Sequence, residues 1–192
     1  MPFIEFKTGK ASGFDGVNIA DIKSNIETLA KPLSHVINLS ISTGIVPNNV
    51  KLAKVIPIYK SDCHCKFSNY RPISILPVFS KVFEKVIYDR LIYFIDKHSI
   101  LYEHQYGFRS NYSTNLAIIQ MVNQISSAID NKELSVGVFL DLSKAFDAVN
   151  HKILLQKLEH YGIRGVALKW IENYLYNRKQ YVAFLVLNHL PT

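Results

Sequence analysis

A nearly unbroken apolar run, residues 134–142, constrains the fold of this chain more than any other segment. Val136, Val138, Phe139 and Leu140 are β-branched or bulky, and the run is short enough to be a single strand. A strand with apolar side chains on both faces belongs in a sheet that is covered on both sides. The segment therefore predicts a buried strand, with the polar residue Asp141 near its end.

Much of the remaining chain has apolar residues at the three-and-four spacing that is typical of amphipathic helices. The clearest pattern predicts a helix at about 78–97, and another predicts a helix at about 114–131 with Ser113 or Thr114 as its N-cap. We expect both apolar stripes to face a core. Shorter patterns predict helices at about 18–29, at 32–43 beginning with Pro32, at 152–160 and at 166–176.

A β-hairpin is predicted in the first half of the chain. A β-rich segment at 54–60 is followed by a polar loop at 61–69 and by a second extended segment at 70–76. Pro72 has no N–H to donate to a neighbouring strand, so we expect the second strand to lie at a sheet edge or to contain a bulge. Helices, a hairpin and one buried strand together predict a helix-rich α+β fold.

Size and composition fit a globular chain of one or two domains, because 48% of the 192 residues are hydrophobic and 19% are charged. No apolar run approaches the roughly 20 residues of a membrane span, and the segment after Met1 lacks the layout of a signal peptide. We therefore expect an intracellular protein that needs no membrane.

The charge balance favours a polyanionic partner. The formal net charge is +7 and the pI is about 9.3. Lysine and arginine near phosphates release condensed counterions, which drives nucleic-acid binding. Many basic proteins bind no nucleic acid, so the charge alone does not decide the question.

The two cysteines, Cys63 and Cys65, flank His64 in the predicted hairpin loop. Residues two apart are poorly placed for an ordinary disulfide, and no second Cys/His pair completes a set of four zinc ligands. We therefore expect a solvated loop rather than a metal site.

Asp141 is the strongest candidate for chemistry. A carboxylate at the end of a buried apolar strand is costly unless something compensates its charge. A Mg²⁺ ion would compensate it, and the backbone carbonyl of Leu142 could add a second oxygen ligand at the turn that follows. Such a carboxylate can equally cap a helix or pair with a lysine.

Residues 138–151, Val-Phe-Leu-Asp-Leu-Ser-Lys-Ala-Phe-Asp-Ala-Val-Asn-His, resemble the first catalytic block of the reverse transcriptases of non-LTR (LINE-type, Jockey-like) retrotransposons. Further blocks resemble that family in the same order, so that the match covers about 9–182. The amino-acid sequences of residues 69–74 and 145–151 favour this family over the related group II intron reverse transcriptases. The further blocks are residues 10–16, 52–60, 69–77, 105–109 with Ser113-Thr114, and 174–181.

The resemblance implies roles for individual residues. Asp141 would bind the catalytic Mg²⁺ ions, and Phe146 would lie under the sugar of the incoming nucleotide. Lys60 and Arg71 would contact its β- and γ-phosphates from the hairpin, although ordinary solvated cations are the alternative. Arg109 would lie near the template strand, and structural packing of its own loop is the alternative.

The same resemblance implies the fingers and an incomplete palm sheet of a right-handed polymerase. Residues 9–135 would be fingers-like, residues 136–182 would be a partial palm and residues 183–192 would be a divergent tail. The implied partners are an RNA template, a DNA primer and dNTPs, with Mg²⁺ as cofactor. Neither the oligomeric state nor the choice between nucleus and cytoplasm is predicted.

Two blocks of the family do not occur in this sequence, namely the aromatic-x-Asp-Asp turn and Gly-x-Pro-Gln-Gly. Two-metal nucleotidyl transfer requires more than one carboxylate. We therefore expect this chain alone not to extend a primer, and extension abolished by Asp141→Asn would contradict that expectation. A non-catalytic nucleic-acid-binding remnant and a degenerate fragment are the alternative functions.

Overall fold

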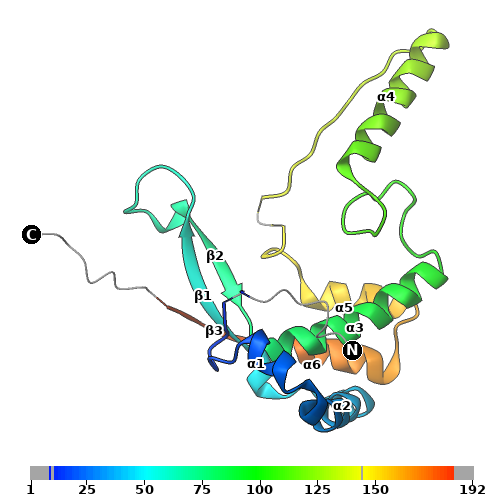
Figure 1. Cartoon of the computed structure of the whole chain (residues 1–192). Coiled ribbons are helices and arrows are strands. Elements are labelled where there is room, and N and C mark those ends of the chain that lie inside the picture. The colour runs from blue at the N-terminus through cyan, green and yellow to red at the C-terminus, as the bar shows by residue number, and fades with distance from the viewer. Residues whose placement is uncertain (1–8, 10, 144, 184–192) are drawn as a thin grey trace, which may run out of the picture. The chain divides into compact units, whose positions relative to one another are not determined.

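A computed structural model describes residues 9, 11–143 and 145–183 (Figure 1). The helices and strands confirm the α+β class with a predominance of helix. None of the described helices is both long enough and apolar enough to cross a membrane. In chain order the elements are α1 (Ile19–Ser24), α2 (Ile26–Thr43), the 3-10 helix η2 (Asn48–Lys51), β1 (Leu52–Tyr59), the 3-10 helix η3 (Phe67–Asn69), β2 (Tyr70–Ile75), α3 (Val78–Lys97), α4 (Thr114–Asp130), α5 (His151–His160), α6 (Gly165–Leu175) and β3 (Lys179–Val182).

The chain divides into two compact units. The larger unit comprises residues 1–90 and 150–192, and the smaller unit comprises residues 91–149. The larger unit contains the sheet, and α3 begins in it and ends in the smaller one.

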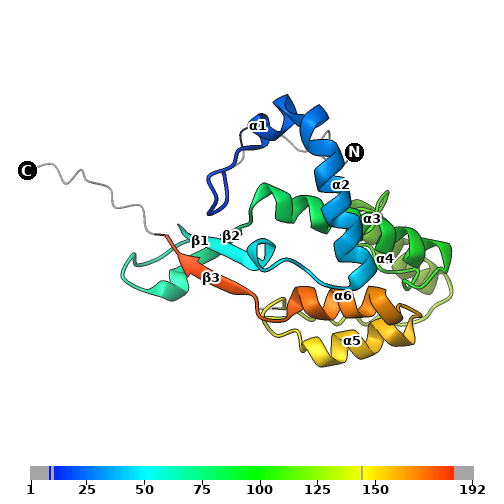
Figure 2. The ribbon, with the colours of Figure 1, turned by 90° about the horizontal axis from the view of Figure 1, so that it is seen from below.

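The sheet of the larger unit has the strand order β2-β1-β3. β1 and β2 form the predicted antiparallel hairpin, with Ile58 opposite Arg71, and β3 runs parallel to β1, with Leu52 opposite Lys179 (Figure 2). β2 is an edge strand, which confirms the position expected from Pro72. Sequence patterning did not predict β3, because four residues are too few to establish an alternation.

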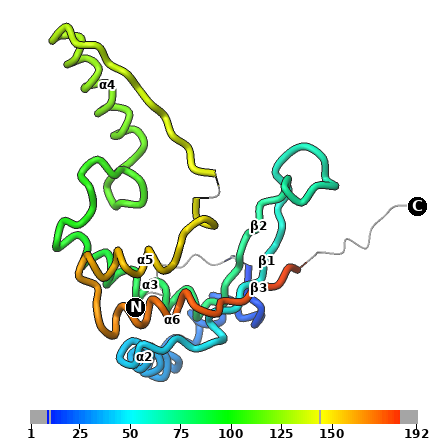
Figure 3. The backbone as a smooth tube through the Cα atoms, turned by 180° about the vertical axis from the view of Figure 1, so that it is seen from behind, coloured from blue at the N-terminus to red at the C-terminus, as the bar shows by residue number. Residues whose placement is uncertain are grey.

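The hydrophobic core of the larger unit lies where α1, α2, the start of α3 and α6 meet. α6 packs against both α2 and α5 (Figure 3). The buried indole of Trp170 on α6 donates a hydrogen bond from Nε1 to Ser40 Oγ on α2, over 2.9 Å. The buried residues of this core are Ile19, Ile22, Ile37, Val46, Val50, Val78, Val82, Phe83 and Trp170.

Two glycines allow close approaches in the larger unit. A Cβ on Gly13 would lie 2.6 Å from both the Cα and the backbone nitrogen of Pro77, so only glycine fits the turn-rich loop against the chain between β2 and α3. Gly44 ends α2 in the left-handed conformation, at φ 71°.

Helix positions agree well with the sequence patterns, with one difference near the N-terminus. α3 matches its predicted span, and Ser113 is the N-cap of α4, accepting a hydrogen bond from the Leu116 N–H over 3.3 Å. The helix predicted at 18–29 is interrupted at Asn25, whose side-chain amide donates to the Asp21 carbonyl over 2.9 Å. Asparagine competes with helical hydrogen bonding in this way. Pro32 lies inside α2 rather than at the start of a helix.

The prediction of a buried strand at 134–142 is wrong for the described structure. These residues carry no strand, and the side chains of Leu134 and Leu140 are 99% and 89% exposed. A strand requires a hydrogen-bonded neighbour, and among the described residues only β1, β2 and β3 form a sheet. The apolar run identifies a segment suited to burial, but it does not supply the partner.

The apolar stripe of α4 is likewise exposed, contrary to the expectation of a core face. α4 buries none of its residues, and Ile119 is 54% exposed. Apart from α4, the described residues of the smaller unit form only loops and the end of α3. Helix amphipathicity therefore predicted the element correctly and its burial incorrectly.

Candidate functional site

The far end of the hairpin brings together two of the predicted site residues, Lys60 and Arg71. The backbone N–H of Lys60 donates to the Asn69 carbonyl over 2.8 Å, so the ladder extends one residue beyond β1. Side chains two residues apart on a strand share a face, and directly opposed residues share a face. Lys60 therefore projects from the same face as Ile58, whose cross-strand partner is Arg71.

Both cations are exposed, and among the described residues neither makes an ion pair or a side-chain hydrogen bond. Their charges are consequently open to an external anion. The buried end of β1 supports this arrangement, because Ala53 and Val55 are both buried and hold the strand against the rest of the larger unit.

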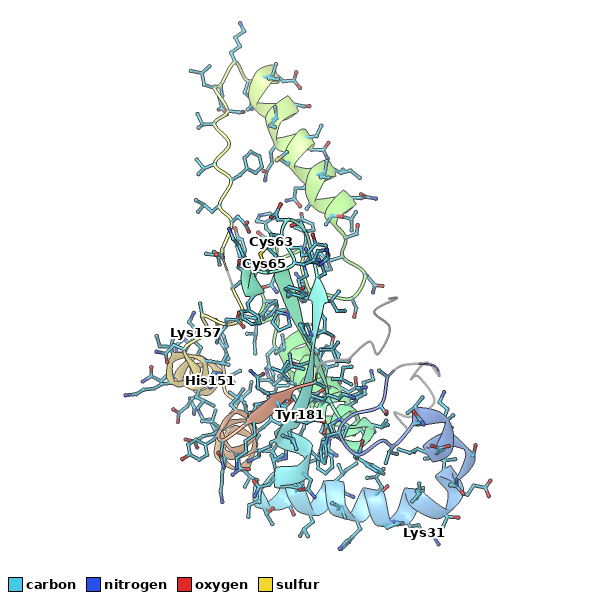
Figure 4. The ribbon with its side chains drawn as sticks, turned by 90° about the vertical axis from the view of Figure 1, so that its left-hand side faces the viewer. Lys31, Cys63, Cys65, His151, Lys157 and Tyr181 are labelled. Atoms are coloured by element: carbon cyan, nitrogen blue, oxygen red, sulfur yellow. A yellow bond between two sulfur atoms is a disulfide. The ribbon has the colours of Figure 1, made fainter. Side chains whose placement is uncertain are left out.

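The hairpin loop is exposed, as predicted, but it contains a disulfide that was not predicted. Cys63 and Cys65 are bonded, with their Cα atoms 5.4 Å apart (Figure 4). The prediction against a disulfide is wrong, because these Cα atoms lie within the ordinary disulfide range of about 4.4–6.8 Å. The loop therefore provides a cross-link instead of free thiols.

His64, between the two cysteines, is held against the end of the hairpin. Its ring stacks on Tyr59 with centroids 3.8 Å apart, and its carbonyl accepts a hydrogen bond from Tyr70 Oη over 3.0 Å. The Asn69 side-chain amide donates to the Cys63 carbonyl over 2.8 Å. The loop is thus tied to the strand ends that carry Lys60 and Arg71.

The smaller unit contains Asp141, Leu142 and Phe146, all exposed. The ring of Phe146 meets the edge of Phe108, with centroids 6.1 Å apart. In the described part of the chain, no three His, Cys, Asp or Glu side chains lie close enough together to hold a metal ion. The Asp141 carboxylate and the Leu142 carbonyl therefore do not form a metal site by themselves.

Arg109 is used inside its own loop. Its Nη1 donates to the carbonyls of Tyr102, Glu103 and Gln105 over 3.3–3.5 Å, and the guanidinium carbon lies 4.0 Å from the ring centre of Tyr112. These contacts are the structural packing that we considered as the alternative to template binding.

The loop that Arg109 organises borders a concavity in the smaller unit. The concavity measures about 630 Å³ and lies between this loop and the first turns of α4. His104 Nδ1 and Gln120 Nε2 are hydrogen-bonded across it over 2.9 Å. Aromatic and amide side chains dominate its lining, which includes Tyr106, Tyr112 and Asn123.

The predicted residues therefore fall into two groups, one in each compact unit. Lys60 and Arg71 belong to the larger unit, whereas Arg109, Asp141, Leu142 and Phe146 belong to the smaller one.

A polar cluster in the larger unit was missed by sequence reasoning. Asn173 Oδ1 accepts hydrogen bonds from the Val46 N–H over 2.9 Å and from Lys51 Nζ over 3.0 Å. The pKa of Lys51 is lowered, first by burial and second by Arg178. Arg178 stacks on the Tyr174 ring, 4.5 Å from its centre, and the Tyr174 hydroxyl donates to Glu84. The adjacent cations Arg178 and Lys179 were the only sequence signal for this cluster.

Comparison with known proteins gives one family. Residues 58–190 match the family described as "Reverse transcriptase (RNA-dependent DNA polymerase)". The chain is 32% identical over 176 residues, 91% of its length, to a probable RNA-directed DNA polymerase from transposon X-element of Drosophila melanogaster. It is 34% identical over 149 residues, 77% of its length, to the RNA-directed DNA polymerase from mobile element jockey of the same organism. These matches cover 19% and 16% of the two relatives, so the chain spans less than a fifth of their length.

Proposed function

The chain belongs to the reverse transcriptase (RNA-dependent DNA polymerase) family, as a non-LTR retrotransposon member, and we propose that it forms the fingers and the first part of the palm of such a polymerase. Residues 9–135 would supply the fingers, and residues 136–182 would supply part of the palm. The β1–β2 hairpin supports this proposal, since it presents two cations at its far end. The intact enzyme would copy an RNA template into DNA from a primer 3′-hydroxyl, inside the cell.

Lys60 and Arg71 would bind the triphosphate of the incoming dNTP. The observation that carries this proposal is their position on one face of the hairpin, exposed and without a carboxylate partner among the described residues. The planar guanidinium of Arg71 suits two phosphate oxygens at once, and the ammonium of Lys60 acts as a point charge beside it.

Asp141 would contribute one ligand to a divalent metal ion, as the family's chemistry requires, with the Leu142 carbonyl beside it. The donor set of the described residues is too small for a complete site, so no chemical step is assigned to a metal in this chain. Phe146 would support the sugar of the nucleotide; its exposed ring is available for such a contact.

Arg109 would act on the template side through the loop that it holds together. Its guanidinium is engaged with backbone carbonyls and Tyr112, so its contribution would be to shape residues 102–112. The neighbouring concavity, lined by tyrosines and amide side chains, offers stacking and hydrogen-bonding groups for the bases of a single strand.

A binding assay on the full 192-residue chain tests the nucleotide site. Arg71→Ala is expected to weaken binding of a fluorescent dNTP analogue, measured by anisotropy, by about 10- to 100-fold. This range corresponds to the roughly 1.5–3 kcal/mol of hydrogen bonds to charged groups. Lys60→Ala is expected to have a smaller effect in the same direction.

Lys31→Ala provides the matched control, because Lys31 is an exposed cation on α2 of the same unit (Figure 4). Equal losses of affinity in Lys31→Ala and Arg71→Ala would refute a specific nucleotide site. Binding of a primer–template duplex with no nucleotide binding would favour the alternative function, a non-catalytic nucleic-acid-binding module.

A further inference from the structure

A small polar cavity lies where β1 and β3 begin, at the end of β1 opposite to the hairpin loop. It measures about 220 Å³ and is lined by three asparagines, two lysines and one leucine. The pairing of Leu52 with Lys179 fixes the two strand starts beside each other, as the ribbon shows (Figure 2). The lining residues are Asn48, Asn49, Lys51, Leu52, Asn177 and Lys179.

The cavity carries positive charge without a lining carboxylate. Lys51 is only 4% exposed, and its ammonium has one hydrogen-bond partner in the described part of the chain, the neutral Asn173 amide oxygen. Burying a cation beside a neutral acceptor is costly, because no opposite charge offsets the lost hydration. Lys179 is exposed at the rim and makes no ion pair within the described residues.

Arg178 increases the local excess of positive charge. It lies close enough to Lys51 to lower the pKa of that ammonium, a result of repulsion between two cations. The Arg178 Nη1 atom is buried and has no hydrogen-bond partner among the described residues. A neighbouring anion would relieve the repulsion and compensate the buried charge of Lys51.

The lining chemistry selects the anion. Asparagine amides and lysine ammonium groups are hydrogen-bond donors suited to phosphate oxygens, and no lining side chain is a carboxylate that would repel them. Ligand pockets for drug-sized molecules measure roughly 300–1,000 Å³. A cavity of about 220 Å³ therefore suits one phosphate group rather than a whole nucleotide.

We propose that this cavity binds a backbone phosphate of single-stranded nucleic acid, at a site separate from Lys60 and Arg71. Lys179 and the amides of Asn48, Asn49 and Asn177 contact the phosphate, and Lys51 supplies charge from beneath. The assignment of the phosphate to a nucleic acid rests on the proposed function, whereas the phosphate site itself does not.

Salt dependence of binding tests the site. Labelled oligo(rU) is titrated into the full chain between about 50 and 200 mM salt, where the slope of log K against log salt is about −0.7 per phosphate contact on a single strand. Lys179→Gln is expected to make the slope about 0.7 less steep. Lys179 is chosen because it is exposed, so that its replacement leaves the fold intact. Lys51→Met is less suitable, because it would also remove the buried hydrogen bond to Asn173.

Lys31→Gln is the matched control, because it removes one exposed charge of the same unit from the first half of α2, and Lys31 does not line the cavity. The proposal expects the wild-type slope in this control. Equal slopes in Lys179→Gln and Lys31→Gln would overturn the nucleic-acid assignment.

A second measurement separates this site from the proposed function. Inorganic phosphate is titrated into ¹⁵N-labelled full chain while the side-chain amide signals of Asn48, Asn49 and Asn177 are followed by NMR. Shifts that are lost in Lys179→Gln support the site, even if the wild-type chain binds no oligonucleotide and the proposed function fails. An absence of shifts in the wild-type chain overturns the phosphate site.

Discussion

The hydrogen bond between Trp170 and Ser40 makes a specific prediction about the stability of the larger unit. Ser40→Ala removes an oxygen that accepts from the Trp170 indole over 2.9 Å and donates to the Ile45 carbonyl over 2.6 Å. Trp170 is 3% exposed, so its N–H loses its acceptor in a buried place, which costs about 1–3 kcal/mol. The bond to the Ile45 carbonyl is only partly buried, so water can replace it.

The helix preference of alanine over serine offsets part of this loss, by roughly 0.5 kcal/mol. The expected net decrease in the free energy of unfolding is therefore about 0.5–2.5 kcal/mol. Urea unfolding followed by tryptophan fluorescence measures it, since Trp170 is the one tryptophan of the sequence. The slope of the free energy against urea should not change.

Ser42→Ala is the matched control for this experiment. Ser42 lies on the same helix, is exposed, and donates only to the nearby Leu39 carbonyl over 3.0 Å. It gains the same helix preference without leaving a buried group unpaired, so its stability should be unchanged or slightly higher. The reasoning fails if Ser40→Ala and Ser42→Ala unfold at the same urea concentration.

Two further predictions concern the Tyr174 hydroxyl and the cysteine pair. The pKa of Tyr174 is raised above the ordinary value of 10.0, first by burial and then by Glu84, so its contribution to stability is complete below about pH 10 and declines at higher pH. Tyr174→Phe should therefore be less stable at neutral pH, by about 1–3 kcal/mol, and should lack this alkaline decline. Lys51, whose pKa is also shifted, is present in both proteins and contributes equally to their stability curves. Parallel curves of stability against pH for variant and wild type would therefore contradict the prediction. Without reductant, Cys63 and Cys65 should not react with iodoacetamide in the denatured chain, and both should react after reduction; mass spectrometry showing two alkylated cysteines before reduction would count against the disulfide.

The elements that sequence patterns predicted well are those whose partners are local. The hairpin needs only β1, its loop and β2, which follow one another directly, and the edge position of Pro72 follows from its missing N–H. α3 was predicted over its whole length, because its apolar spacing is regular and its first turns find a core in the same unit. The disulfide was missed because a separation of two residues along the chain does not fix the distance in space, and the two Cα atoms lie 5.4 Å apart here.

The residues of the candidate site also differ in whether their positions depend on neighbours that are near or far in the sequence. The pairing of Lys60 and Arg71 follows from strand register, which two adjacent segments of the sequence specify, so the amino-acid pattern alone suffices to place both residues on one hairpin. The position of Asp141 depends on whether residues 134–142 find a neighbouring strand, and an apolar pattern records the need for burial without recording which segment satisfies it. The Lys51 cluster was not predicted at all, because its residues come together only in the folded chain. Residues near 46–51 and 173–179 are far apart in sequence, and no periodicity in either segment indicates that Asn173 joins them. The positive charge of this cavity therefore arises from the parallel pairing of β1 with β3, which brings Lys51 and Lys179 together. A binding function of this cavity can be found by experiment, although comparison of sequence motifs does not predict it.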